Sequence, residues 1–228
     1  MGENEKISQD SPLLPALMEL IDINGNKRLS NQIYFIIEIE KMKTVLRQTL
    51  LSDGSRREND AEHSWHLAIA ALLLHEHAAA ANINIEAALK MALVHDLVEV
   101  YAGDTFAYDK TANQQKKIRE RAAADRLFAV LPDGQGAEFR ALWEEFDAEE
   151  TIEAKYAAAI DRFLPLVNNF LTNGHTWKNG GVDSADVYKR MDLIREGVPA
   201  LWPIVENIIE KSIEMGILKQ EGCRSSPQ

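Results

Sequence analysis

The sequence predicts an all-α protein that folds as a single helical domain. Ala is abundant and aromatic residues make up only 7% of the chain, a composition that favours helices. Apolar residues recur at helical spacing through most of the chain, and no alternating apolar and polar stretch longer than a few residues indicates a strand. At 228 residues, the chain is long enough to bury one sizeable core.

Charge and composition exclude several classes of function. The apolar content of 46% and charged content of 27% are typical of soluble globular proteins. A net charge of −11 argues against a broad nucleic-acid-binding surface and against an anionic membrane partner, so an anionic substrate needs a locally basic pocket. The single Cys223 allows no intrachain disulfide. The polar amino terminus and the lack of a membrane-length apolar run indicate the cytoplasm.

We expect a polar leader over residues 1–12, a helical body over 13–218 and a polar tail over 219–228. Gly-rich sequence at 174–181 predicts a loop that contains a histidine and a tryptophan. The expected helices, in chain order, cover about residues 13–23, 31–46, 61–81, 84–102, 111–130, 135–146, 151–173, 183–195 and 203–215.

Capping residues mark where several of these helices begin and end. Ser30 or Asn31 is suited to cap the second helix, and Asp60 the third, because short polar side chains accept hydrogen bonds from free backbone N–H groups. Asn84 is expected to cap the helix that follows. Gly103 provides the exit from that helix.

The stretch from Leu93 to Glu99 places polar side chains inside an apolar run. Successive helical residues point about 100° apart, so His95 and Asp96 can bracket one point beside the helix axis. Glu99 lies four residues beyond His95 and three beyond Asp96, on the face that they share. Burying this cluster is costly unless a metal or a tight polar network compensates. We therefore expect a functional site here.

Two further residues of metal-binding type lie elsewhere in the chain. His63 occupies the first turn of its helix, and Asp161 is embedded in apolar sequence. With His95 and Asp96 they form a mixed nitrogen and oxygen set that suits Mn²⁺, Co²⁺, Fe²⁺, Zn²⁺ or Mg²⁺. Each residue also has a plain structural interpretation, as a cap, a core pair or the partner of an arginine. Together, in this order, they favour a hydrolytic metal site.

The remaining histidines and the basic residues carry weaker signals. His66 is a candidate for supporting a ligand from behind. His75 and His77 lie near the polar, Ala-rich end of their helix and are interpreted as surface residues. Four basic residues are further candidates to bind phosphate, although each also has the plain interpretation of a solvated charge; these are Arg56, Arg57, Lys116 and Lys117.

Two sequence blocks resemble a known family. The block Arg-Glu-Asn-x-x-Glu-His-Ser at 57–64 and the block His-Asp-x-x-Glu-x-x-x-Gly-Asp at 95–104, followed by Asp161, resemble the HD-domain metal-dependent phosphohydrolases. More narrowly, they are similar to the branch of bacterial 5′-deoxyribonucleotidases and their eukaryotic HD-domain-containing relatives. The resemblance covers about residues 28 to 170 and implies a helical bundle that removes phosphate from nucleoside 5′-monophosphates.

The resemblance also assigns roles to residues. It implies that Glu99 and Asp104 act beside the metal-bound water, one as general acid or base and the other positioning the substrate. It implies that Arg47 contacts phosphate and that Thr105 and Phe106 contact the nucleotide. The implied metal ligands are His63, His95, Asp96 and Asp161.

One residue departs from the pattern of this branch, and the absence of further histidines indicates how many metal ions are bound. Gln48 stands where the 5′-deoxyribonucleotidases carry the Trp that screens the sugar 2′ position, which leaves the preference between deoxyribose and ribose open. Members with two metals carry additional histidines between the His-Asp pair and the final Asp. No His occurs from Leu97 to Ile160, so we expect one divalent metal.

Other interpretations remain open at this point. If the protein is an enzyme, its substrate is alternatively a nucleoside triphosphate or another phosphoester, although the basic arrays that a triphosphate needs are not evident. If the protein is not an enzyme, the alternative is a metal-binding but inactive dimeric scaffold. The resemblance implies a homodimer, for which Trp143, Trp177 and Trp202 are candidate interface residues.

Overall fold

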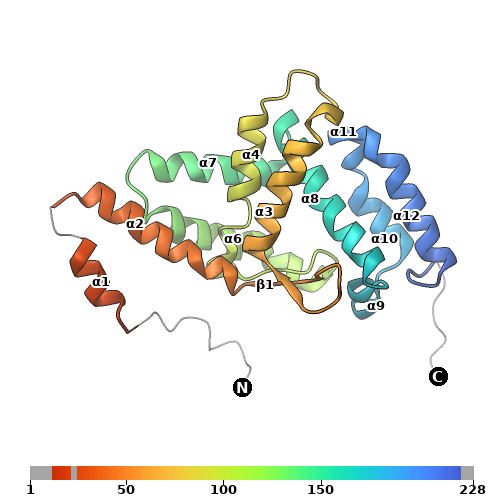
Figure 1. Ribbon diagram of the computed structural model, residues 1–228, viewed down its shortest axis with the longest axis horizontal. Helices are drawn as coiled ribbons and strands as arrows, with labels where there is room; N and C mark the ends of the chain where they lie inside the picture. Colours follow the sequence, from red (N-terminus) through yellow and green to blue (C-terminus); the bar gives the residue numbers. More distant parts are fainter. Residues whose placement is uncertain (1–11, 22–24, 222–228) are drawn as a thin grey trace.

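A computed structural model of the chain describes residues 12–21 and 25–221 (Figure 1). The expected leader, apart from residue 12, and most of the expected tail lie outside these residues. The helices are α1 (Leu14–Ile21), α2 (Lys27–Ile39), α3 (Asp60–Leu73), α4 (Ile85–Val94), α5 (Glu99–Ala102), α6 (Lys110–Phe128), α7 (Gln135–Ala148), α8 (Ile152–Leu171), α9 (His175–Gly180), α10 (Ser184–Met191), α11 (Ile194–Gly197) and α12 (Trp202–Glu214). Short 3₁₀ turns are η2 (Glu40–Lys43), η3 (His75–His77) and η4 (Pro199–Leu201). The all-α class is confirmed.

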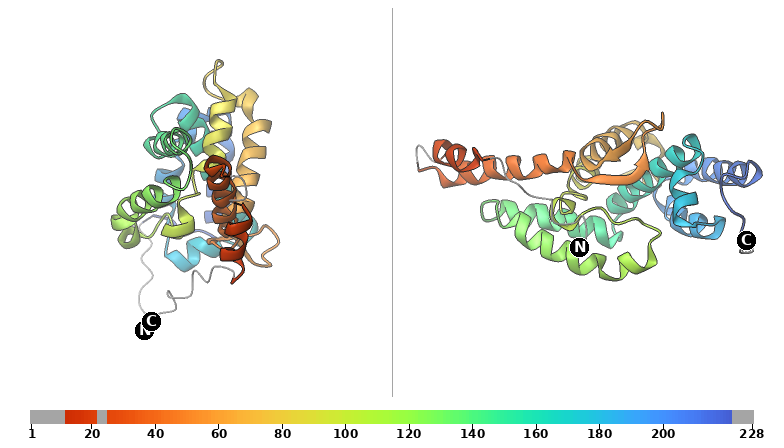
Figure 2. Two further views of the ribbon diagram at one scale, coloured as in Figure 1. Left: turned by 90° about the vertical axis from the view of Figure 1, so that its left-hand side faces the viewer. Right: turned by 90° about the horizontal axis from the view of Figure 1, so that it is seen from below.

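Helix α8 forms the centre of the bundle. It packs against α3, α4, α7, α10, α11 and α12. One apolar core surrounds its contacts with α3, α4 and α10 to α12, and a second core joins α5, α6 and α7 to α2. Helices α2, α6 and α7 therefore occupy one end of the molecule, and α10 and α12 the other (Figures 1 and 2). Within the described residues, no helix is long and apolar enough to cross a membrane.

A two-stranded hairpin is a departure from the predicted fold. The sequence predicts one helix over 31–46, but α2 ends at Ile39 and is followed by the strands β1 (Leu46–Leu50) and β2 (Arg57–Asn59). The strands are antiparallel, with Leu46 opposite Asn59 and Leu50 opposite Arg57. Each strand is too short to show clear alternation, so only pairing across the hairpin reveals it.

The helix predicted over 84–102 is interrupted at its most polar point. Helix α4 ends at Val94, α5 begins at Glu99, and the four residues between them form a turn. Here the backbone switches to shorter-range hydrogen bonds, such as Glu99 N–H to the Asp96 carbonyl at 2.9 Å, which tighten the chain. Gly103 ends α5 as expected, in a left-handed conformation with φ of 72°.

Helix caps differ from prediction at two of three sites. Asn84 caps α4 as expected, through a 3.2 Å hydrogen bond from Ala87 N–H. Asn26, rather than Ser30 or Asn31, caps α2. Asn59, rather than Asp60, caps α3, because its side chain and that of Glu62 satisfy each other's backbone N–H groups.

The aromatic residues and the Gly-rich segment also differ from expectation. The predicted loop at 174–181 forms helix α9, whose Trp177 is buried. Trp143 and Trp202 are buried as well, so none of the three tryptophans provides the expected interface surface. Gly197 brings α11 close to α8, since a Cβ there would lie 2.4 Å from the Lys155 carbonyl oxygen.

Candidate metal centre and substrate pocket

Four side chains from segments far apart in sequence meet in the interior. His63 lies in the first turn of α3, His95 and Asp96 in the turn after α4, and Asp161 in the middle of α8. His63 Nε2 is 2.8 Å from Asp161 Oδ1, and His95 Nε2 is 3.8 Å from the same oxygen. Asp96 Oδ2 lies 3.0 Å from His95 Nε2. The structure therefore brings together all four metal ligands that the resemblance implies.

The environment of His95 fits a metal ligand. Its Nδ1 lies 2.9 Å from the Ala92 carbonyl oxygen, and donation to that oxygen leaves Nε2 with a lone pair. Nε2 is buried, has no hydrogen-bond partner and faces the carboxylate of Asp96. A lone pair facing a carboxylate is repulsive unless a cation lies between them. The Phe146 ring, 4.6 Å from the imidazole ring, helps to shield this site from water.

His63 and Asp161 form an ion pair in the metal-free protein. Burial and the nearby Arg47 guanidinium act to lower the pKa of His63. The carboxylates of Asp161 and Glu58 outweigh both effects and raise this pKa to about 9. Burial opposes ionisation of Asp161, but its hydrogen bond to His63 holds its pKa well below the ordinary range. The proton shared by His63 and Asp161 thus occupies the position that a metal ion would take, and metal binding must release this proton.

A second group of carboxylates lies beside the histidines. Asp60, Asp96 and Glu99 place oxygens within 4.8 Å of one another. Burial, followed by the charge of Asp96, raises the pKa of Asp60 to about 7 and that of Glu99 well above its ordinary value. Burial also raises the pKa of Asp104. Low solvation and mutual repulsion therefore favour protonated carboxyls at Asp60, Glu99 and Asp104. Burial also opposes ionisation of Asp96, but the charges of His95 and Arg47 lower its pKa overall.

Asp60 is a site residue that the sequence analysis missed. The sequence predicts that Asp60 is a helix cap, but its side chain is completely buried and neither carboxylate oxygen has a hydrogen-bond partner. Because Asn59 takes the capping role, Asp60 is free to point inward. Its position three residues before His63 places both on one helix face, and this spacing is the signal that could have found it.

Arg47 on β1 provides a buried positive charge within the carboxylates. Its Nη1 lies 2.6 Å from Asp96 Oδ2 and 3.5 Å from Asp60 Oδ1, and its Nε lies 3.8 Å from Glu58 Oε2. Burial acts to lower the pKa of Arg47, but the carboxylates raise it overall. The hairpin that the sequence did not predict is therefore the element that positions this guanidinium.

A polar cavity of about 200 Å³ opens beside the centre. All four residues that the resemblance assigns to the substrate, Arg47, Gln48, Thr105 and Phe106, line it together with Glu99 and Asp104. The Thr105 hydroxyl accepts a 2.8 Å hydrogen bond from Arg119. Polar or aromatic lining residues that the sequence did not single out include Tyr108, Asn113, Arg162, Asn169 and Arg190.

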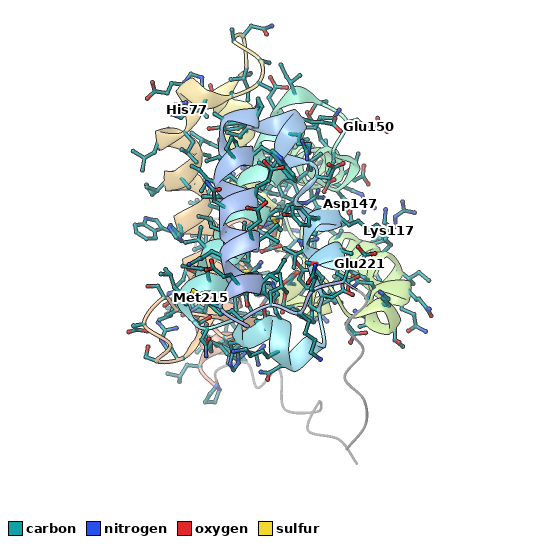
Figure 3. All side chains as sticks on the ribbon, turned by 90° about the vertical axis from the view of Figure 1, so that its right-hand side faces the viewer. His77, Lys117, Asp147, Glu150, Met215 and Glu221 are labelled. Atoms are coloured by element: carbon teal, nitrogen blue, oxygen red, sulfur yellow. The ribbon has the colours of Figure 1, made fainter. Side chains whose placement is uncertain are left out.

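The histidines at 66, 75 and 77 and three of the four basic candidates lie outside the cavity, whereas Lys116 lines it. His66 is exposed, so the supporting role considered for it is wrong. His75 and His77 are exposed, as expected, and His77 lies at the outer edge of the molecule (Figure 3). Arg56 forms an ion pair with Glu62, and Arg57 hydrogen bonds to backbone carbonyls of β1.

Comparisons with known proteins agree with this geometry. A solved structure from Magnetospirillum magnetotacticum MS-1, described as a predicted metal-dependent phosphohydrolase, is 47% identical and covers 86% of this chain and 98% of its own, with a TM-score of 0.82. The 5′-deoxynucleotidase HDDC2 of Xenopus laevis is 32% identical over 105 residues, 46% of this chain and 50% of that protein. That of Danio rerio is 28% identical over 140 residues, 61% and 68% of the two chains.

The matched segments span half to about two thirds of these curated relatives. The fold and the site define a helical protein with buried histidines and carboxylates positioned to bind a metal. The family model described as HD domain matches residues 39–202, which include all four of the converging side chains. The chain belongs to the HD domain family.

Proposed function

We propose that this protein is a metal-dependent phosphohydrolase that removes phosphate from nucleoside 5′-monophosphates. The observation that carries the proposal is that the histidine and carboxylate centre and Arg47 line the same cavity, with Arg47 Nη1 2.6 Å from Asp96 Oδ2. An arginine fork matches two phosphate oxygens. The curated relatives are named 5′-deoxynucleotidases, which supports this substrate class.

We assign one divalent metal to His63, His95, Asp96 and Asp161. The unpartnered Nε2 of His95 and the mixed nitrogen and oxygen donors support this set. When bound, such an ion lowers the pKa of water and neutralises charge on phosphate oxygens. The donor set is compatible with Mn²⁺, Co²⁺, Fe²⁺, Zn²⁺ and Mg²⁺, which the assay below compares.

We assign proton transfer to Glu99 and Asp104. Burial and the neighbouring carboxylates raise the pKa of Glu99 well above its ordinary value and so favour its protonated form, which is suited to donate a proton to the leaving 5′ oxygen of the nucleoside. Asp104 lines the same cavity and is less strongly perturbed, so we assign it to accept a proton from the attacking water and to orient the substrate.

We also propose a cytoplasmic homodimer. On α3, Trp65, Ile69, Leu72 and Leu73 have exposed fractions of 65%, 39%, 52% and 72%. These residues follow one helix face and form a contiguous apolar stripe of the kind that subunit contacts cover. Here the stripe on α3 takes the place of the buried tryptophans as the expected interface.

Phosphate release from a nucleotide panel tests the proposed function. The metal-free protein is supplied with each candidate metal and given deoxyribo- and ribonucleoside 5′-monophosphates, 3′-monophosphates and triphosphates. We expect metal-dependent release from the 5′-monophosphates, and Gln48 at the sugar position predicts that ribose is accepted as well as deoxyribose. Faster release from triphosphates, or none with any metal, would overturn the proposal.

A further inference from the structure

Arg190 is a cation of the cavity that lacks a counterion. It lies near the end of α10 and lines the cavity beside the metal centre. The other basic side chains of the cavity each have a carboxylate: Arg47 contacts Asp96, Lys116 lies 3.4 Å from Glu120, and Arg162 contacts Glu149. Over the part of the chain that the structure describes, the Arg190 guanidinium forms no hydrogen bond or ion pair.

Lys116 links Arg190 to the catalytic end of the cavity. Burial acts to lower the pKa of Lys116, while Glu120, Glu99 and Asp96 raise it, and Arg190 is close enough to act in the opposite direction. Lys116 therefore lies within electrostatic range both of the carboxylates of the centre and of the Arg190 guanidinium. Both cations line a single cavity, from α6 on one side and from α10 on the other.

A hydrogen bond from Arg162 holds the backbone of Arg190 at the cavity wall. Arg162 Nη1 donates a 3.4 Å hydrogen bond to the Arg190 backbone carbonyl, so two arginines lie next to each other. The charges of Arg190 and Arg162 both act on Tyr108, whose ring packs against Phe106 in the cavity wall. This end of the cavity is therefore basic and partly aromatic.

Four carboxylates on the cavity wall or on α10 pair with cations other than Arg190. Glu120 and Glu149 pair with Lys116 and Arg162. Asp186 lies 3.5 Å from Lys110, and Asp147 lies 3.8 Å from Lys117; Asp147 and Lys117 are side by side at the edge of the molecule (Figure 3). The positive charges of Arg190 and Lys116 repel each other in this partly enclosed site. An anionic ligand group bound between them would be attracted to both and would offset this repulsion.

We propose that Arg190 and Lys116 form a second anion-binding subsite, which takes a second phosphate of the substrate while the first lies at Arg47 and the metal centre. The inference rests on the proposed function and narrows its substrate class. The preferred substrates are then small phosphomonoesters with two phosphate groups, such as nucleoside 3′,5′-bisphosphates. The arginine provides the planar fork for this phosphate and the lysine a point charge.

Paired kinetics on the metal-loaded protein test the subsite. Adenosine 3′,5′-bisphosphate and AMP are compared as substrates of the wild type, Arg190→Gln and Lys189→Gln. Lys189 is the matched control, since it lies next to Arg190 on α10, has the same charge and is exposed. We expect the wild type to have the higher kcat/KM for the bisphosphate. Arg190→Gln should reduce the bisphosphate-to-monophosphate ratio roughly 10- to 100-fold, as expected for loss of a charged hydrogen bond, and Lys189→Gln should preserve it.

Calorimetric binding to the metal-free protein separates this inference from the proposed function. If AMP is hydrolysed but the bisphosphate is neither preferred nor affected selectively by Arg190→Gln, the subsite is wrong and the phosphatase assignment stands. If neither compound is hydrolysed but the bisphosphate binds more tightly than AMP in an Arg190-dependent way, the subsite stands and the phosphatase assignment fails. A loss in Arg190→Gln that depends on the nucleobase rather than on the second phosphate would overturn the subsite, because Arg190 would then contact the base.

Discussion

At the scale of single residues, the centre is dominated by the cost of burying charge. Asp60, Asp96 and Glu99 lie within a few ångströms of one another, and Arg47 is the guanidinium that contacts both aspartates. Replacement of Arg47 would therefore affect the metal ligands as well as the substrate, unlike replacement of a residue that contacts phosphate alone. Its removal would leave Asp96 without its buried cation as well as weaken substrate binding.

Glu99→Gln tests the assigned proton donor. The amide keeps the shape of the side chain but cannot donate a proton to the leaving oxygen as an acid does, so we expect kcat to fall about 10²–10⁴-fold. Metal content by elemental analysis should be unchanged, because Glu99 is outside the four-ligand set. Glu76→Gln, at an exposed position, is the control. Near wild-type turnover with metal bound, together with a lower melting temperature, would instead show a structural role for Glu99.

Asp60→Asn tests the pH dependence that burial imposes. The raised pKa of Asp60, about 7 in the folded protein, means that its stabilising contribution is complete below about pH 4 and is lost as the pH rises through 7. Asn stays neutral, so the variant should gain in melting temperature relative to the wild type between pH 5 and pH 8, by about 2–4 °C for each kcal/mol.

The Asp60→Asn measurement uses chelator-treated protein, so that metal binding does not contribute. Asp133→Asn is the control, since Asp133 is an exposed turn residue and its replacement should give the same difference at both pH values. A melting temperature difference for Asp60→Asn that shrinks with rising pH would contradict the burial argument.

At the scale of secondary-structure elements, short irregular segments position the chemistry. The hairpin carries Arg47 on one strand and Glu58 on the other, and the turn between α4 and α5 directs His95, Asp96 and Glu99 inward. The capping box at the start of α3 has a similar effect, because Asn59 holds the helix terminus while the next residue points into the site. Local backbone geometry thus sets the direction of the functional side chains.

Asn59→Ala tests this coupling between a helix cap and the site. Loss of the cap should cost about 1 kcal/mol, or about 2–4 °C in melting temperature, and should weaken metal binding by loosening the first turn around His63. Asn84→Ala removes an equivalent cap from α4 at the end remote from His95. We expect a comparable loss of stability there without a change in calorimetric metal affinity. Equal affinity in all three proteins would show that the cap acts on stability alone.

At the scale of the whole molecule, the candidate metal centre takes residues adjacent to both cores: Asp161 on α8 follows Ile160 of one core, and His95 follows Val94 of the other. The apolar stripe on α3, by contrast, is exposed. The core and the proposed interface are thus separate surfaces of the same helix: His63 and Leu67 are buried, and Trp65 and Leu72 are exposed.

Trp65→Lys tests the proposed homodimer. A charge in the apolar stripe should convert a dimer to a monomer in light scattering at micromolar concentration, because a buried unpaired lysine is strongly unfavourable. Ile118→Lys is the matched control, since Ile118 is 72% exposed but lies on α6, away from the stripe. A wild-type protein that is already monomeric would contradict the proposal directly.

The sequence by itself determined the helical class and the set of polar residues that meet in the site. Helical periodicity is a local property, and a histidine or carboxylate inside apolar sequence is conspicuous, so His95, Asp96 and Asp161 could be selected in advance. His63 lies between polar neighbours and was selected from its order with the other three and from the family resemblance. The exit at Gly103 and the cap at Asn84 followed from equally local chemistry.

Only the tertiary structure decided which partners these residues meet. The hairpin exists because two short strands pair across a turn, and neither strand has a pattern of its own. Asp60 is of a residue type that often caps helices, but Asn59 caps α3 and the Asp60 side chain is buried in the site instead. Arg190 lies 143 residues beyond Arg47, yet both line one cavity. Spatial proximity of this kind depends on how the helices pack against one another, and the residue pattern within a single helix does not predict it.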